Sequence, residues 1–67
     1  MLAMEELELL TLEDVARILR ISEESVRIKL RSGEIRGFKL GRGRKSHWKV
    51  KREELKRYIN EQESQQN

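Results

Sequence analysis

The sequence predicts a small α+β domain, mostly helical, with three short helices and a two-stranded β-hairpin. Apolar residues recur at spacings of three and four residues in two consecutive segments, which is the pattern of helices with one buried side. The spacing then changes to two residues on both sides of a basic, glycine-containing segment, as in a hairpin. Helical spacing returns near the C-terminus, and a chain of 67 residues has room for a single small core.

The first helix is expected at residues 12–19. Thr11 and Asp14 stand three residues apart, the spacing of a capping box, in which each side chain accepts a hydrogen bond from the backbone of the other residue. Apolar residues at positions 12, 15, 16 and 19 then form one stripe that faces the core. Residues 1–10 precede this helix start and are interpreted as an acidic lead-in with some helical character.

The second helix begins after a short break, with Ser22 as its N-cap and Gly33 as the left-handed residue that ends it. Val26 and Leu30 lie one turn apart and are expected to face the core. Ile28 is then exposed and free to touch a thymine methyl group, although a different roll of the helix would bury it. Two short helices joined in this way form a helix-turn-helix unit.

The hairpin is expected to cover the two helices with one apolar face. Alternation within each strand assigns four residues to that face: Phe38, Leu40, Trp48 and Val50. Lys39 and Lys49 are then assigned to the outward face, and residues 41–47 form the connecting loop. A last helix is expected to start near Arg52 and to turn apolar residues at positions 55, 58 and 59 toward the core.

Positive charge is concentrated in the segment that contains the hairpin. Residues 1–34 carry five basic and eight acidic groups, whereas residues 35–52 carry eight basic groups and no acid. Such a segment is typical of a surface that binds phosphates, which favours a nucleic acid as the partner. The alternative is a solvated hairpin whose cations only keep the protein soluble.

Composition argues against several other classes of protein. The chain has no cysteine, and His47 is its single histidine, so neither a disulfide nor an ordinary zinc site is expected. No apolar run approaches the roughly 20 residues of a membrane span, and no signal peptide is recognised. We therefore expect a cytoplasmic, nucleoid-associated protein with no cofactor and no small-molecule substrate.

Five segments stand in order along the chain: Leu10-Thr11-Leu12-Glu13-Asp14-Val15-Ala16, Ile21-Ser22, Arg31-Ser32-Gly33-Glu34-Ile35, Phe38-Lys39-Leu40-Gly41 and Trp48-Lys49-Val50. Over about residues 9–60 this order resembles the excisionase-type helix-turn-helix domain of the MerR-like winged-helix group. The resemblance implies a winged helix-turn-helix DNA-binding domain at residues 11–60. Residues 1–10 are then the acidic lead-in, and residues 61–67 a polar, frayed tail.

The resemblance also implies how the domain acts. The helix at 22–32 would enter the major groove of double-stranded DNA, and the wing at 41–47 would reach an adjacent minor groove or the backbone. Members of this group act in recombination or as transcription regulators. A second copy, as a dimer or a cooperative array, and a recombinase or polymerase are the further partners that this implies.

Five positions depart from the pattern of this group. Glu23 and Glu24 stand where basic or polar residues are common, and Lys51 stands where proline is frequent. Ile28 and Lys29 have the reverse of the usual basic-then-apolar order. Acids at the groove-entering end of the helix repel phosphate, but they can accept hydrogen bonds from cytosine amino groups.

Two sets of residues are the candidate DNA contacts. On the second helix they are Ser22, Glu23, Ser25, Arg27, Ile28 and Arg31. On the wing and hairpin they are Lys39, Arg42, Gly43, Arg44, Lys45, His47 and Lys49. Arginine and lysine suit phosphates and guanine, and arginine also suits a narrow minor groove.

Several of these residues have a second interpretation. Arg27 can pair with Glu23 or Glu24 on the helix surface instead of binding guanine, and Ser22 is favoured as a helix cap. Trp48 is favoured as a core residue over a platform for base stacking, and the basic residues of the hairpin strands can simply solvate them.

Three other functions remain as alternatives to double-stranded DNA binding. A protein-interaction module on the same fold would use the acidic N-terminal half against a basic partner. An RNA-binding role is less favoured because the three aromatic residues all fit core positions rather than exposed stacking positions. An enzyme is the least favoured, since no nucleophile with a base and no catalytic carboxylate pair is recognised.

Overall fold

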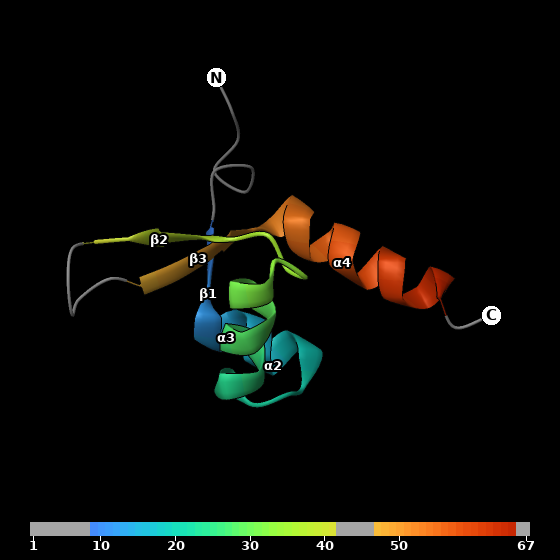
Figure 1. Ribbon diagram of the computed structural model, residues 1–67, viewed down its shortest axis with the longest axis horizontal. Coiled ribbons are helices and arrows are strands. Elements are labelled where there is room, and N and C mark those ends of the chain that lie inside the picture. The colour runs from blue at the N-terminus through green and yellow to red at the C-terminus, as the bar shows by residue number, and fades with distance from the viewer. Residues whose placement is uncertain (1–8, 42–46, 66–67) are drawn as a thin grey trace, which may run out of the picture.

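The computed structural model describes residues 9–41 and 47–65. The elements follow the order β1 (Leu9–Thr11), α2 (Leu12–Leu19), α3 (Glu23–Ser32), β2 (Phe38–Leu40), β3 (His47–Lys51) and α4 (Arg52–Ser64). The strands form one antiparallel sheet in the order β1-β3-β2. In Figure 1, α2 and α3 lie below the sheet, and α4 extends to the right, away from β2 and β3. The predicted class, α+β and mostly helical with three helices, is confirmed.

Helix α2 begins and ends where its sequence signals predict. Thr11 Oγ1 accepts from the backbone N–H of Asp14 at 3.0 Å, and Asp14 Oδ2 accepts from the backbone N–H of Thr11 at 3.0 Å. This reciprocal capping box satisfies backbone donors that a helix start leaves without partners. At the other end Arg20 adopts the left-handed conformation, with φ 58°, and the next N–H donates to the carbonyl of Ala16 at 3.1 Å.

Helix α3 is capped at both ends by the residues expected to cap it. Ser22 Oγ accepts from the backbone N–H of Ser25 at 3.1 Å, and Gly33 closes the helix with φ 86°. Val26 and Leu30 are buried, so the helix has the expected roll. The predicted helix-turn-helix unit is confirmed by these two helices. Ile35, which lies outside the periodic segments, is also fully buried.

A third strand, β1, was not expected. Leu9, Leu10 and Thr11 pair with Lys51, Val50 and Lys49 of β3. The helical character predicted for residues 1–10 is therefore wrong at Leu9 and Leu10, because pairing with β3 places Leu10 in the core, where it is 7% exposed. Tertiary contacts of this kind override local helix propensity. The hairpin is accordingly part of a three-stranded sheet instead of a two-stranded one.

The apolar face predicted for the hairpin is split between the two faces of the sheet. Val50 is fully buried and Trp48 packs against the core, but Phe38 and Leu40 are 37% and 47% exposed. The register explains the difference, since Leu40 pairs with His47. His47 therefore belongs to β3, and the prediction that it is part of the connecting loop is wrong.

A one-residue change of register turns every side chain of a strand to the other face. Lys39 consequently pairs with Trp48 and shares its face, whereas Lys49 pairs with Phe38. The prediction that Lys39 and Lys49 lie together on the outward face is wrong for this reason.

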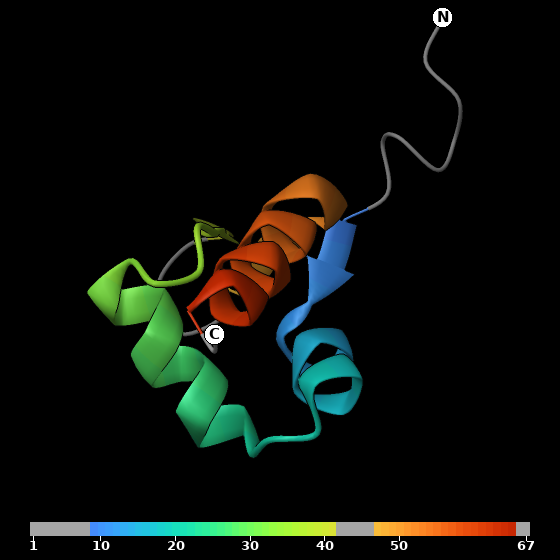
Figure 2. The same cartoon turned by 90° about the vertical axis from the view of Figure 1, so that its right-hand side faces the viewer.

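Helix α4 begins at Arg52, as predicted, but continues to Ser64. The expectation of a frayed tail from residue 61 is therefore wrong for residues 61–64. Half-buried Ile59 and Gln62 line a hollow together with Leu19 and Ile21 at the α2–α3 turn. Figure 2 shows α4 above the space between α2 and α3. Of the residues in this part of α4, Ile59 packs against the core, while most of the helix sequence is polar.

Candidate nucleic-acid interface

The outward side of α3 is the first part of the candidate interface. Since Val26 and Leu30 face the core, the opposite side of the helix exposes Glu24, Ile28 and Arg31. Ile28 lies in the middle of this side and is 54% exposed. The prediction that Ile28 faces solvent is therefore confirmed, and the alternative roll that would bury it is excluded.

One flank of α3 faces the sheet. Arg27 lines a hollow with His47, Trp48 and Lys49 of β3, and the start of α2 closes the other side of this hollow. Arg27 Nη1 also lies 3.2 Å from Glu24 Oε1, so the surface pair anticipated from the sequence forms with Glu24. The Arg27 side chain as a whole is 40% exposed, so a phosphate or a base can still reach it. Helix α3 and strand β3 thus bring basic side chains to one place.

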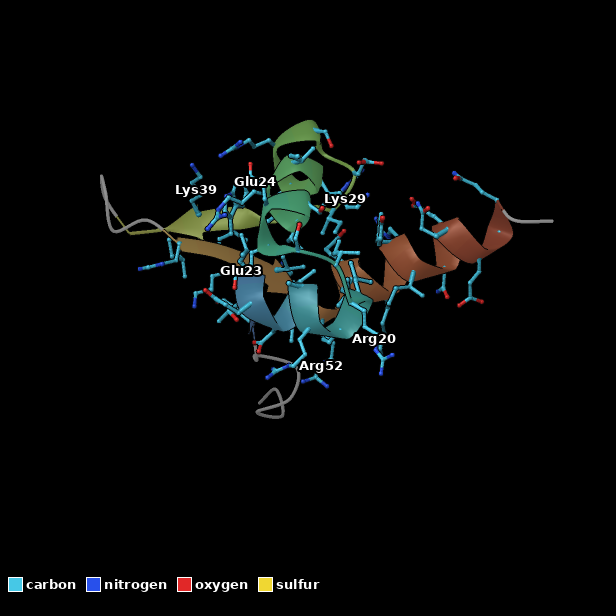
Figure 3. The ribbon with its side chains drawn as sticks, turned by 90° about the horizontal axis from the view of Figure 1, so that it is seen from below. Arg20, Glu23, Glu24, Lys29, Lys39 and Arg52 are labelled. Carbon is cyan, nitrogen blue, oxygen red and sulfur yellow. The ribbon has the colours of Figure 1, made fainter. Side chains whose placement is uncertain are left out.

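The other flank of α3 faces α4 instead. Lys29 Nζ lies 5.8 Å from the centroid of the Tyr58 ring and 3.9 Å from Glu34 Oε2. In Figure 3, Lys29 lies on the side of α3 toward α4, whereas Glu24 and Lys39 lie on the side of the hairpin. The two flanks are therefore different surfaces, and the hairpin-side flank continues onto β2 and β3.

The hairpin adds cations to this surface from both faces of the sheet. Lys39 Nζ lies 5.2 Å from the centroid of the Trp48 ring, within the range of a cation–π contact. Trp48 is half-buried against the core, in agreement with its predicted core role. Lys39 therefore has a defined position over the indole rather than being a freely solvated strand lysine.

Two serines at the start of α3, Ser22 and Ser25, already have roles within the fold. Ser22 Oγ accepts the capping bond and donates to Ser25 Oγ at 2.9 Å. The capping interpretation of Ser22 is therefore confirmed, and its use toward DNA stays a prediction. Glu23 is exposed in the first turn of the helix. The wing residues Arg42, Gly43, Arg44 and Lys45 lie outside the described residues.

Asp14 is an acid whose ionisation is set by its surroundings. The N–H and side chain of Thr11 are the main cause that holds the pKa of Asp14 below its ordinary value of 3.8, and the charges of Arg17 and Lys49 act in the same direction. Arg17 Nη2 lies 2.7 Å from Asp14 Oδ1. The role of the Asp14 carboxylate is therefore to cap the start of α2.

Within the part of the chain that the structure describes, no group of three or more potential side-chain ligands is placed to hold a metal ion. The helices among residues 9–41 and 47–65 are also too short or too polar to cross a membrane.

Two short helices joined by a tight turn, with the second exposing a polar side next to a basic hairpin, define the helix-turn-helix class of DNA-binding domain. A family model described as a helix-turn-helix domain matches residues 9–63, so the chain belongs to this family. The match begins at β1 and ends within the last turn of α4, and it indicates double-stranded DNA as the partner. No curated protein and no solved structure matches the chain.

Proposed function

We propose that this protein binds double-stranded DNA sequence-specifically, with α3 in the major groove and the β2–β3 hairpin as a wing on the flanking backbone or minor groove. The observation that carries the proposal is the shared hollow of Arg27, His47 and Lys49. Because a helix and a strand both contribute basic side chains to the lining of this hollow, which Glu13 of α2 shares, a single duplex can contact both. The proposed activity is binding alone, with no reaction step and no cofactor.

The resemblance extends the proposal to the wing and to a biological role. Arg42, Arg44 and Lys45 are assigned to phosphates or to a narrow minor groove, and Gly43 to close approach of the backbone. The proposed arrangement is that of a MerR-like winged helix, and the proposed role is that of an excisionase-like recombination factor or a small transcription regulator on DNA in the cytoplasm.

The small size of the domain indicates that tight and specific DNA binding requires more than one DNA-contacting module. A single module of this kind buries roughly 600–1,000 Å² of protein surface, which gives modest affinity. A second copy on a neighbouring site, a recombinase or a polymerase would supply the remaining affinity and specificity.

Salt dependence of duplex binding tests the proposal. Contact with about five phosphates predicts that log affinity falls with log salt at a slope of about −4 to −5. The double variant Arg42→Ala/Arg44→Ala should weaken binding and reduce the magnitude of this slope by about 2. Lys56→Ala/Arg57→Ala is the matched control, because it removes two exposed cations from α4, which extends away from the hairpin in Figure 1.

Selection of bound duplexes from a random pool tests the division of roles. If the wing only holds the backbone, the double wing variant should keep the preferred sequence while binding all duplexes more weakly. A changed preferred sequence would assign base recognition to the wing. No association with any duplex at low ionic strength would overturn the proposal.

One observation favours a second function, namely a protein-interaction module. Phe38 and Leu40 are exposed on β2, an edge strand of the sheet. Exposed apolar side chains on an edge are a common feature of surfaces that bind another protein. This function would be favoured if the chain bound another protein, if added duplex DNA did not compete with that binding, and if Phe38→Ser abolished it.

A further inference from the structure

The fold itself gives no role to the most exposed large apolar side chain on α3. Ile28 is 54% exposed on a helix whose other outward residues are polar or charged. Val26 and Leu30 each stand two residues away, and at about 100° per residue Ile28 points away from both. Burial therefore does not explain an isoleucine at this position.

The neighbours of Ile28 show what kind of surface it belongs to. Glu24 lies one turn before it and Arg31 three residues after it, and both are exposed on the same side of the helix. An acid and a guanidinium are groups that hydrogen-bond to base edges, whereas an aliphatic side chain between them needs an apolar contact. The outward side of α3 therefore combines two hydrogen-bonding side chains with one apolar side chain between them.

We propose that Ile28 recognises thymine through its 5-methyl group in the major groove. The inference rests on the proposed function, because it places the outward side of α3 against base edges. Among the four bases, thymine alone presents a methyl group there, and the other base edges present hydrogen-bonding nitrogens and oxygens. Burying an isoleucine against those atoms would leave them without partners, so the side chain also disfavours the other bases.

The flanking residues limit where this thymine lies. Along a helix, Glu24 and Arg31 are about 6 Å and 4.5 Å from Ile28, at a rise of about 1.5 Å per residue. With base pairs stacked about 3.4 Å apart, both neighbours fall within about two base pairs of the thymine. Arg31 suits a guanine on one side, and Glu24 suits the amino group of cytosine or adenine on the other.

Replacing thymine with deoxyuridine tests the proposal directly, because this removes the methyl group and leaves every hydrogen-bonding group in place. The duplex preferred by the wild-type protein is first obtained by selection, and each thymine is then replaced in turn. At one position within the α3 footprint, the loss of one buried methyl should weaken binding about threefold to fivefold. Ile28→Ala should bind the thymine and uracil duplexes equally at that position.

Ile18→Ala is the matched control, because Ile18 is an isoleucine on α2 with a similar exposure of 50%. This variant should keep the full preference for thymine over uracil. Thermal unfolding of all three proteins checks that each is folded.

The outcomes separate this inference from the function on which it rests. Salt-dependent duplex binding in which no uracil replacement weakens the wild-type complex would overturn the role of Ile28 and leave the proposed function standing. The same holds if Ile28→Ala keeps the thymine preference. An absence of duplex binding under low-salt conditions would instead overturn the proposed function itself.

Discussion

Two residues end helices α2 and α3 in the left-handed conformation, and they differ in how well they suit it. Gly33 has φ 86° and Arg20 has φ 58°. A non-glycine residue in this region is strained by roughly 1–2 kcal/mol, whereas glycine adopts it without strain. Arg20 therefore stores strain at the turn of the helix-turn-helix unit.

Arg20→Gly is expected to raise the free energy of unfolding by about 0.5–1 kcal/mol, because relief of strain exceeds the added flexibility of the unfolded chain. Urea denaturation followed by circular dichroism measures the change. Arg20→Ala is the control, since it removes the same side chain but keeps a Cβ atom, and it should not stabilise. Equal stabilisation by both variants would show that the side chain, and not the backbone, was unfavourable.

The carboxylate of Asp14 makes the stability of the fold depend on pH. The pKa of Asp14 is lowered in the folded protein, mainly by hydrogen bonds with Thr11. Its carboxylate therefore stabilises the fold at pH values above its unfolded pKa, and this contribution is lost as the pH falls through the folded pKa.

As the pH falls through the ordinary value of 3.8 and then through the lower folded pKa, wild-type protein should thus lose more stability than Asp14→Asn, whose amide does not titrate. Urea midpoints at several pH values compare the two proteins, and Glu13→Gln serves as the exposed neighbouring control. Parallel loss of stability in wild type and Asp14→Asn would contradict the assignment.

At the scale of elements, Gly37 sets how closely β2, β3 and α3 approach one another. A Cβ atom at this position would lie 2.7 Å from Leu30 Cδ2, 2.9 Å from the carbonyl oxygen of Lys49 and 3.2 Å from Val50 Cγ2. The backbone oxygen cannot move without shifting β3. The absence of a side chain at Gly37 therefore allows the hairpin to lie this close to Leu30 of α3.

Gly37→Ala is expected to destabilise the fold by about 1–3 kcal/mol, the usual cost of overpacking. Gly33→Ala is the informative comparison, since a Cβ there meets nothing within 4 Å and only backbone strain is added. If Gly37→Ala weakens duplex binding more than Gly33→Ala at equal folded fraction, the attachment of the hairpin also matters for binding. A fully stable Gly37→Ala variant would contradict the close approach.

The elements also differ in how far sequence reasoning could predict them. The bounds of α2 and α3 were predictable because Thr11, Ser22 and Gly33 make contacts within a few residues of themselves. Strand β1 and the hairpin register were not, since both depend on which residue of β3 lies opposite, and Leu40 opposite His47 has no local signal. Because this register was not predictable, neither was the placement of Lys39 and Lys49 on opposite faces of the sheet. The outward position of Ile28, by contrast, was predictable from the spacing of Val26 and Leu30.

At the scale of the whole molecule, the distribution of charge matters more than its net value of +3. The hairpin side of α3 carries Arg27 and lies next to the cations of β3, but Glu24 lies on the same side and pairs with Arg27 at 3.2 Å. An acid in this position repels every phosphate equally. It therefore lowers affinity for all sequences while leaving base-edge contacts to distinguish the preferred one.

Glu24→Gln should consequently raise affinity for an unrelated duplex, by about twofold to fivefold at low salt, because it removes one repulsive charge and releases Arg27 for phosphate. Affinity for the selected duplex should rise less, so that discrimination between the two duplexes falls. Fluorescence anisotropy with both duplexes, repeated at two salt concentrations, measures this ratio. Glu53→Gln is the matched control, since Glu53 is also an exposed acid in the first turn of a helix, but on α4. An equal rise in affinity for both variants would mean that only net charge matters, whereas a rise confined to Glu24→Gln places the repulsion at the surface shared by α3 and the hairpin.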